Sequence, residues 1–510
     1  MSLAAQLVAQ VGAPVSFRGP TIDYHALAPE IVLSAAVVVL VLLDSIKLER
    51  AKAYMPVVTN LALLGALIPL LTLAYDGGTR ALFGGSYVVG PMPLLLKAMF
   101  IVTTYVVVLL STNYMAEGDY WESEYYTLLV SSLLGMVVMA SSRDLIGIFV
   151  ALELLSIPAY MLASWRKGDV RSNEAGLKYF LMGVFASAVL LYGMSLVYGL
   201  GGSTRLEDIG RVLADAPTDG VPVVTLALVF VVIGFAFKVS AVPFHVWAPD
   251  TYEGAPTPVT TFLAVASKAA GFVALISLVF YAFLPRADII EPLFFVLAIG
   301  SMTVGNLAAL RQTNVVRMLA YSGIAHAGFM LAPFVVAGSN PFRSMQSIVV
   351  YLVIYAAMNL GAFACIIAMA RQTRSAELKD LAGVVRSMPG LAWCMVLFLA
   401  SLIGMPPLGG WYAKFGAFRA AVDAGGGWGY SIAIIGAANA VVATAYYITV
   451  MREMWMKPVP ENADTSSVKV PASLQAALAI CGVATLAFGV VPGIIAKVGS
   501  ITDLTGAFHL

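Results

Sequence analysis

The chain has 510 residues, of which 60% are hydrophobic and only 11% are charged, where soluble proteins average about 25% charged residues. This composition excludes a water-soluble protein, and the net charge of +1 argues against a nucleic-acid partner. Apolar runs of about 20 residues recur along the whole chain, each long enough to cross a hydrocarbon layer about 30 Å thick.

Residues 1–27 precede the first of these runs and are predicted to form an extracytoplasmic segment. They lack a basic stretch directly before an apolar core, so we expect no cleaved signal peptide. The next region, residues 28–124, contains three predicted spans. Its runs at 31–43 and 61–75 are apolar on every side, unlike the alternating strands of a transmembrane β-barrel. We therefore predict an all-α polytopic membrane protein in contact with the lipid bilayer.

Polar interruptions divide the chain into about fourteen predicted transmembrane helices. They begin near Ala28, Pro56, Met92, Tyr125, Asp144, Asn173, Val223, Pro258, Ile289, Val316, Met345, Leu391, Gly429 and Pro471. Fifteen of the 29 Lys and Arg residues fall in one set of alternate loops, and eight fall in the set that includes both chain ends. Because cytoplasmic loops are rich in Lys and Arg, we expect both termini to be extracytoplasmic.

Two predicted helices are broken. Span seven contains Pro243, and span twelve contains Pro406 and Pro407 followed by two glycines. An interior proline removes a backbone donor, and irregular backbone at membrane depth is tolerated only where protein or water satisfies it. A single proline is more often an ordinary kink, but two breaks near lysines favour an inverted-repeat transporter with its site at the breaks. The second broken span comes five spans after the first. Because five is an odd number, the second unit crosses the membrane in the opposite direction to the first.

Ionisable side chains lie within the predicted spans, where each charge costs roughly 2.5–3.5 kcal/mol. Burial favours the neutral form of an amine and a nearby carboxylate favours the charged form, so a buried Lys and Glu can exchange protons. We predict a proton relay of Glu153, Lys238, Lys268 and Lys414. The alternative for each is a static pair or a side chain that reaches the interface, and the second of these is preferred for Lys97 and Lys178.

Two histidines are further candidates for the relay. His245 follows the span-seven break, and His326 lies inside span ten. Imidazole titrates near neutral pH, although a lone histidine in an apolar helix is just as often a hydrogen-bonded core residue. Hydroxyls that could act as spacers, or simply bond backbone, are those of Tyr321, Ser322, Ser240 and Ser267.

The sequence predicts no cofactor or metal in this chain. Cys365, Cys394 and Cys481 lie in apolar runs and lack metal-ligand spacing, so we interpret them as buried apolar residues. The stretch GLGGST at 199–204 lacks a nucleotide-binding fingerprint and is interpreted as a loop. Transport must therefore be energised by an ion gradient or by a partner subunit.

Four motifs between residues 144 and 414 carry a resemblance to a known family. They are ALELLSIPAYML around Glu153, FKVSAVPFHVWAPDTYEGAPTPVTTFLAVASK ending at Lys268, NVVRMLAYSGIAHAG from Asn314, and GMPPLGGWYAKF around Lys414. In this order they resemble the antiporter-like membrane subunits of respiratory complex I (NADH:quinone oxidoreductase), which are related to Mrp-type cation/proton antiporter subunits. Some subunits of this family have lysine in the second broken helix and others are expected to have glutamate there. Lys414 fits the kind with lysine.

The resemblance implies a fold of fourteen helices with two inverted five-helix repeats. Spans four to eight would form the first repeat (125–284) and spans nine to thirteen the second (285–456), followed by span fourteen and a C-terminal segment (457–510). Glu153 and Lys238 would form the ion pair of the first half-channel, Lys268 the central relay, and Lys414 the link to the opposite side or to the next subunit.

The resemblance also implies the partners. Quinone reduction in other membrane and peripheral subunits, which bind NADH, FMN, iron–sulfur clusters and quinone, would drive protons outward across a bacterial inner membrane. Two departures from the family are Val316 before Arg317, where a Lys-Arg pair is common, and Gly323, where serine is common. A sodium/proton antiporter subunit and a static scaffold are the alternative functions.

Overall fold

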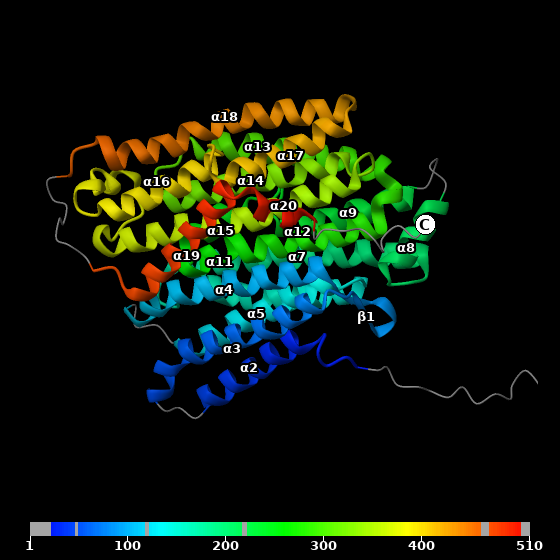
Figure 1. Ribbon diagram of the computed structural model, residues 1–510, viewed down its shortest axis with the longest axis horizontal. Coiled ribbons are helices and arrows are strands. Elements are labelled where there is room, and N and C mark those ends of the chain that lie inside the picture. Colours follow the sequence, from blue (N-terminus) through cyan, green and yellow to red (C-terminus); the bar gives the residue numbers. More distant parts are fainter. Residues whose placement is uncertain (1–21, 46–48, 118–121, 217–221, 461–468, 501–510) are drawn as a thin grey trace, which may run out of the picture.

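The computed structural model describes residues 22–45, 49–117, 122–216, 222–460 and 469–500. Within these ranges the chain is a bundle of nearly parallel helices with one short β-hairpin (Figure 1). Most of the predicted N-terminal segment (1–21 of 1–27), and 461–468 and 501–510 of the predicted C-terminal region (457–510), lie outside the described residues.

Three long helices and the hairpin come first. Their bounds are α2 (Ala28–Ser45), α3 (Glu49–Asp76), β1 (Arg80–Leu82), the 3₁₀ turn η1 (Phe83–Gly85), β2 (Tyr87–Val89) and α4 (Pro91–Glu117). The two strands are antiparallel, with Arg80 opposite Val89. The hairpin lies at one end of the bundle, where β1 is labelled in Figure 1.

The next elements carry the first break. They are α5 (Glu122–Ser141), α6 (Leu145–Ala163), α7 (Val170–Gly201), α8 (Leu206–Asp215), α9 (Pro222–Lys238), α10 (Trp247–Gly254), α11 (Thr257–Phe262), η2 (Leu263–Ser267), α12 (Lys268–Leu278), η3 (Val279–Phe283) and η4 (Leu284–Arg286). Asp144 is the N-cap of α6, because its carboxylate accepts hydrogen bonds from the amides of Ile146 and Gly147. Both η2 and η3 are π-helical turns.

The second break lies in the remaining elements. They are α13 (Ala287–Ala309), α14 (Val315–Leu331), η5 (Ala332–Val336), α15 (Pro341–Thr373), η6 (Leu378–Leu381), η7 (Val384–Arg386), α16 (Pro389–Ile403), α17 (Gly409–Ala424), α18 (Gly426–Met456), α19 (Ala472–Val490) and α20 (Pro492–Ser500). Asn314 caps α14 as Asp144 caps α6, by accepting from the amides of Val316 and Arg317.

Eleven helices in the described ranges are long and apolar enough to cross a membrane, which confirms a polytopic helical membrane protein. The sequence predicted fourteen. Three predicted spans are not separate long helices, because spans eight and nine run together over Thr257–Ala309, α9 is short, and α16 is bent at the η7 turn. The count of fourteen and the inverted repeats stay predictions.

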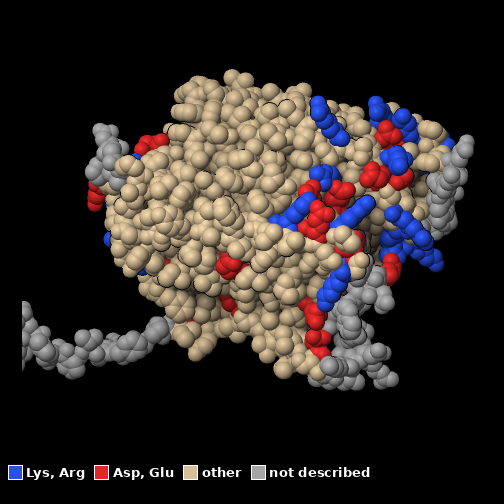
Figure 2. Space-filling model, turned by 180° about the vertical axis from the view of Figure 1, so that it is seen from behind, with Lys and Arg blue, Asp and Glu red and all other residues tan. Residues whose placement is uncertain are grey.

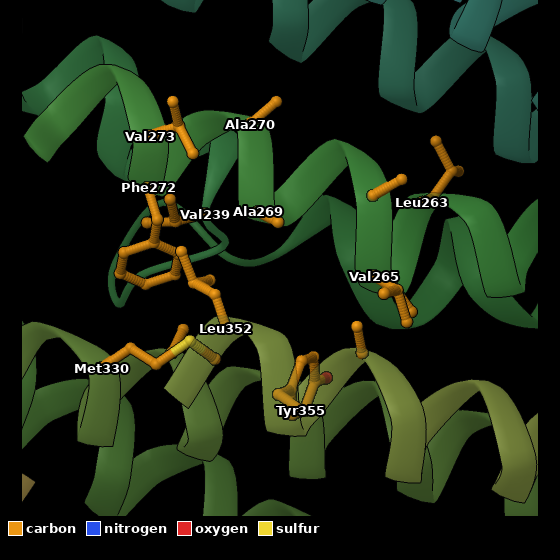
Figure 3. Close-up of a cluster of buried hydrophobic side chains, with 14 of the residues drawn as sticks. Val239, Leu263, Val265, Ala269, Ala270, Phe272, Val273, Met330, Leu352 and Tyr355 are labelled. Atoms are coloured by element: carbon orange, nitrogen blue, oxygen red, sulfur yellow. The ribbon is translucent and has the colours of Figure 1, made fainter. Parts of the chain in front are cut away.

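The middle of the bundle is shielded from its surroundings. The apolar windows within Thr257–Ala309 and Pro341–Thr373 are 100% and 94% buried, against 28% for α2. Figure 3 shows why: Phe272 of α12 and Val239 beside the first break face Leu352 of α15, across a layer of apolar side chains. The helix that begins at Lys268 therefore occupies the interior of the protein rather than a lipid-facing surface.

The outer surface is mostly apolar. On the face shown in Figure 2, Lys, Arg, Asp and Glu side chains gather towards one end and leave a broad surface of other residues. Such a surface suits contact with hydrocarbon.

Candidate functional site

The first break, between α9 and α10, is held by one side chain of α10 and one of α13. α9 ends at Lys238. The indole nitrogen of Trp247 donates to the Phe237 carbonyl at 3.1 Å, and Ser301 of α13 accepts from the Val242 amide at 2.9 Å. Irregular backbone inside the bundle is thus satisfied by protein groups, as the membrane interior requires.

The second break, after α16, places a buried ammonium on two helix carbonyls. The carbonyls of Leu402 and Ile403 would normally bond the amides four residues later, but Pro406 and Pro407 have no amide hydrogen. Lys414 Nζ, on α17, donates to these carbonyls at 3.0 and 2.8 Å. The Lys414 side chain therefore replaces the two donors that the double proline removes.

The predicted ion pair of Glu153 and Lys238 is not a direct contact. Glu153 is half-buried and accepts from the Ser187 hydroxyl of α7 at 2.6 Å. Buried Lys238 Nζ donates to the Ser156 hydroxyl at 2.9 Å and the Tyr179 hydroxyl at 3.3 Å. Ser156 comes three residues after Glu153, on the same side of α6, and bonds the ammonium in its place. The Glu153 and Lys238 charges still interact electrostatically.

Lys268 lies at the centre of the bundle, directly after the π-helical turn η2. Such turns often mark functional positions. The buried Nζ donates to the Gly323 carbonyl of α14 at 2.8 Å. The neighbouring Ser267 side chain acts electrostatically on Tyr179, which also accepts from Lys238. One tyrosine therefore bonds Lys238 and interacts with the residue before Lys268.

His326 is fully enclosed, between two of the buried lysines. Its Nδ1 lies 2.8 Å from the Tyr351 hydroxyl and its Nε2 lies 3.2 Å from the Tyr447 hydroxyl. The charges of Lys268 and Lys414 both act on the imidazole. A ring with a hydroxyl on each nitrogen can take a proton on one side and release one on the other.

His245 is in a different setting. It lies in the turn between α9 and α10, is half-buried, and its Nδ1 has no hydrogen-bond partner among the described residues. Of the four predicted spacer hydroxyls, that of Ser322 bonds the Tyr447 hydroxyl. The structure thus gathers His326 with the lysines but leaves His245 at the edge of the break.

The interpretation of Lys97 as a side chain that reaches the interface is wrong. Its side chain is 0% exposed and its Nζ lies 2.6 Å from Glu30 Oε1, because the hairpin and α2 enclose it. Lys178, given the same interpretation, is 43% exposed and pairs with Glu174 and Asp250.

A charge network lies at the beginning of α14, where the sequence departs from the family. Arg317 Nη1 donates to Asp250 at 2.8 Å and to Glu253 at 2.9 Å. Asp250 also accepts from Lys178 of α7. These bonds join α10, which follows the first break, to a helix of the predicted second repeat.

Several polar residues of the site were not predicted. Tyr351, Tyr355 and Asn359 follow one another at intervals of four along α15, and Asn359 donates to the Tyr355 hydroxyl at 3.0 Å. That spacing places them on one face of a helix and would have been a usable signal. Ser156 and Tyr179 had none, because single hydroxyls are common in membrane helices.

The chemistry available is proton transfer between amines, hydroxyls, an imidazole and a carboxylate. Within the described ranges, no three His, Cys, Asp or Glu side chains form a group that could hold a metal, and the three cysteines are free.

Comparisons with known proteins agree on the family. The model of the family "NADH:quinone oxidoreductase/Mrp antiporter, TM" matches residues 142–438. A Trichlorobacter lovleyi protein named NADH-quinone oxidoreductase subunit N is 37% identical over 476 residues, covering 93% of this chain and 96% of the relative. A Solibacter usitatus protein named NADH-quinone oxidoreductase subunit N 2 is 42% identical over 411 residues, covering 80% and 82%.

Solved structures show the same fold. A chain of respiratory complex I from Thermus thermophilus has 32% identity and a TM-score of 0.75, with 92% of this chain and 98% of that chain covered. A chain of the Mrp complex from Dietzia sp. has 19% identity and a TM-score of 0.82, with 95% and 98% covered. The second likeness concerns the fold alone.

Proposed function

Because this chain belongs to the NADH:quinone oxidoreductase/Mrp antiporter transmembrane family, we propose that it is a proton-translocating membrane subunit of an NADH:quinone oxidoreductase. It would correspond to subunit N, the name that its Trichlorobacter and Solibacter relatives carry. Its partners would be the other membrane and peripheral subunits of complex I, which would bind NADH, FMN, iron–sulfur clusters and quinone. It would lie in a bacterial plasma membrane with both termini extracytoplasmic.

The observation that carries this proposal is how the three buried lysines are bonded. Lys238 donates to two hydroxyls, Lys268 to one carbonyl and Lys414 to two carbonyls. Among the described residues, no carboxylate lies within 4.0 Å of any of these ammonium groups. A buried cation held only by neutral acceptors is costly, and it can lose its proton without leaving a carboxylate unpaired. A static scaffold gives no reason to keep three such groups.

In the proposed mechanism, protons move along the middle of the bundle. Lys238 exchanges with Lys268 through the Tyr179 and Ser267 hydroxyls, each of which can donate and accept. Lys268 exchanges with Lys414 through His326, on which both lysine charges act. Water molecules would complete the steps between groups that are not in contact.

Coupling to the partner subunits would act through Glu153. Its carboxylate is half-buried and acts on Lys238 through space rather than by contact. Quinone reduction would change the charge of a neighbouring subunit, and this change would weaken or strengthen the hydrogen bond between Ser187 and Glu153. The Glu153 carboxylate would then move relative to Lys238 and change the proton affinity of that lysine.

The test is Lys238→Ala in a complex that still assembles. We expect NADH-driven proton pumping to fall, with the coupled quinone reductase rate, because the first amine of the relay is gone. Lys178→Ala is the matched control, since Lys178 is a partly exposed lysine of a neighbouring helix. Unchanged pumping in Lys238→Ala would refute the relay and favour the scaffold.

The alternative is a sodium/proton antiporter subunit of the Mrp type. The chain of the Dietzia Mrp complex has the same fold as this protein, but its 19% sequence identity says nothing about which ion this protein transports. Sodium-dependent proton flux from the full chain reconstituted alone in liposomes would support the antiporter. Absence of that flux, together with loss of pumping in Lys238→Ala, would support the redox-driven complex.

A further inference from the structure

A buried ion pair outside the relay joins the hairpin to the first helices. Glu30 lies in the first turn of α2 and Lys97 lies in α4, and both side chains are almost fully enclosed. Tyr87 of β2 completes the group. We call Glu30, Tyr87 and Lys97 the hairpin triad.

Both bonds to the Glu30 carboxylate fall on the same oxygen. Glu30 Oε1 lies 2.6 Å from Lys97 Nζ and accepts from the Tyr87 hydroxyl at 2.6 Å. Lys97 also donates to the Tyr87 hydroxyl at 3.3 Å. Glu30 Oε2 is buried and has no hydrogen-bond partner among the described residues.

This arrangement is a poor way to stabilise a fold. A buried ion pair roughly breaks even against apolar residues of the same volume, and a buried acceptor without a partner is destabilising. The free oxygen is, however, the atom that a proton would join, and Lys97 would keep the ionised form of Glu30 stable once the proton leaves. The geometry thus suits a carboxyl that changes its protonation state.

Hydrogen bonds connect the hairpin to the helix that carries Lys268. The Arg143 amide donates to the Ser86 carbonyl, next to Tyr87, at 2.8 Å. The Arg143 guanidinium donates to the Ser277 hydroxyl of α12 at 3.0 Å. Ser277 lies about 13 Å along α12 from Lys268 at 1.5 Å per residue.

The triad also lies at the end of the bundle where protons would leave. The hairpin joins the second and third predicted spans, so the distribution of basic residues places it on the extracytoplasmic side. The Glu30 side chain is 11% exposed, whereas that of Lys97 is 0% exposed. The pair is therefore exposed only through the Glu30 side chain, although Oε2 itself is buried.

We propose that the hairpin triad is a proton-exchanging site at the extracytoplasmic end of the chain, in which Glu30 receives protons and releases them outward. A proton joins Glu30 Oε2 while Lys97 stays charged, and its departure to the surface restores the ion pair. No electron transfer or co-reactant is needed. The proposal rests on the proposed function, because the relay supplies the proton.

The experiment compares three variants in the assembled complex in proteoliposomes, by protons released per electron pair. Glu30→Gln keeps the shape and the hydrogen-bonding atoms but cannot ionise, and we expect at least a two-fold fall. Glu30→Asp can ionise and should retain more pumping than Glu30→Gln. A purely structural role predicts the opposite order, because glutamine preserves the packing and aspartate shortens the side chain.

Tyr87→Phe keeps the ion pair and removes one hydroxyl, so it tests the triad even if a Glu30 variant fails to assemble. We expect Tyr87→Phe also to lower the number of protons released per electron pair. Asp288→Asn is the matched control, because Asp288, in the first turn of α13, pairs with the buried Arg286 at 2.9 Å at an end of the bundle that is also predicted to be extracytoplasmic. Pumping by Glu30→Gln equal to that of the control would overturn the proposal. If Lys238→Ala still abolished pumping in that case, the proposed function would stand without the triad.

Discussion

Loss of Lys414 should destabilise the protein far more than loss of Lys238, although both are buried lysines beside a helix break. The comparison uses Lys414→Met and Lys238→Met, because methionine keeps an unbranched apolar chain and removes only the ammonium. The difference comes from the acceptors. Lys414 satisfies two carbonyls that have lost their normal donors to proline, whereas Lys238 bonds two hydroxyls.

The expected magnitudes follow from those bonds. Hydrogen bonds to charged groups contribute about 1.5–3 kcal/mol each, and two carbonyls left unsatisfied cost a similar amount, so the two lost bonds should cost Lys414→Met roughly 3–6 kcal/mol, partly offset because a buried cation is removed. The hydroxyls of Ser156 and Tyr179, unlike helix carbonyls, can rotate towards other acceptors. Lys238→Met also removes the cost of a buried cation, so its change should stay within about 1 kcal/mol.

The assay is the apparent thermal unfolding midpoint of each full-length chain in mild detergent, followed by tryptophan fluorescence. We expect the Lys414→Met midpoint to fall by several degrees and the Lys238→Met midpoint to stay near that of the wild type. Equal midpoints, or a less stable Lys238→Met, would refute the assignment of Lys414 as the donor that replaces the two proline amides.

Three further predictions concern the helix cap, the charge network and the carboxylate of the relay. Asp144→Ala removes the N-cap of α6 and should cost about 0.5–2 kcal/mol, seen as a lower midpoint in the same thermal assay; an unchanged midpoint would count against the cap. A double-mutant cycle of Arg317→Ala and Asp250→Asn should give a coupling of about 0.5–1 kcal/mol, because the pair is about one-third exposed; zero coupling would show that the network does not join α10 to α14. Glu153→Gln should lower proton pumping in the assembled complex, and Glu153→Asp should retain more because it keeps the charge; equal pumping by the two variants would contradict an electrostatic role for Glu153.

Local features of the fold were predictable from the sequence. The apolar runs gave the helical membrane class, and the two proline breaks appear where Pro243 and the Pro406–Pro407 pair stand. These are effects of composition and of neighbouring residues, which act through the backbone of one helix. The π-helical turn before Lys268 has no such signal, because its residues are ordinary apolar ones.

The lysines of the site were predictable, but their partners were not. A charge at membrane depth is visible in a sequence, whereas the acceptor that meets it comes from another helix. Lys97 and Glu30 are 67 positions apart, and His326 and Tyr447 are 121 apart. Only the tyrosines and asparagine at intervals of four on α15 had a pattern that would have revealed a shared face.

Glu153 and Lys238, expected as an ion pair, are not in contact for a related reason. Opposite charges in neighbouring helices favour contact, but Ser187 and Ser156 each hold one of the two groups at hydrogen-bond distance. Small hydroxyls that fit between helices are easily missed in a sequence, and here they decide the geometry.

We propose that the buried lysines exchange protons through a hydrated interior, and a map of the assembled complex that resolves ordered water would test this. We expect water and the side chains of Tyr179, His326 and their neighbours to connect Lys238, Lys268 and Lys414 in steps of hydrogen-bond length. Packed apolar side chains that separate any two of these lysines, with no water between them, would contradict it.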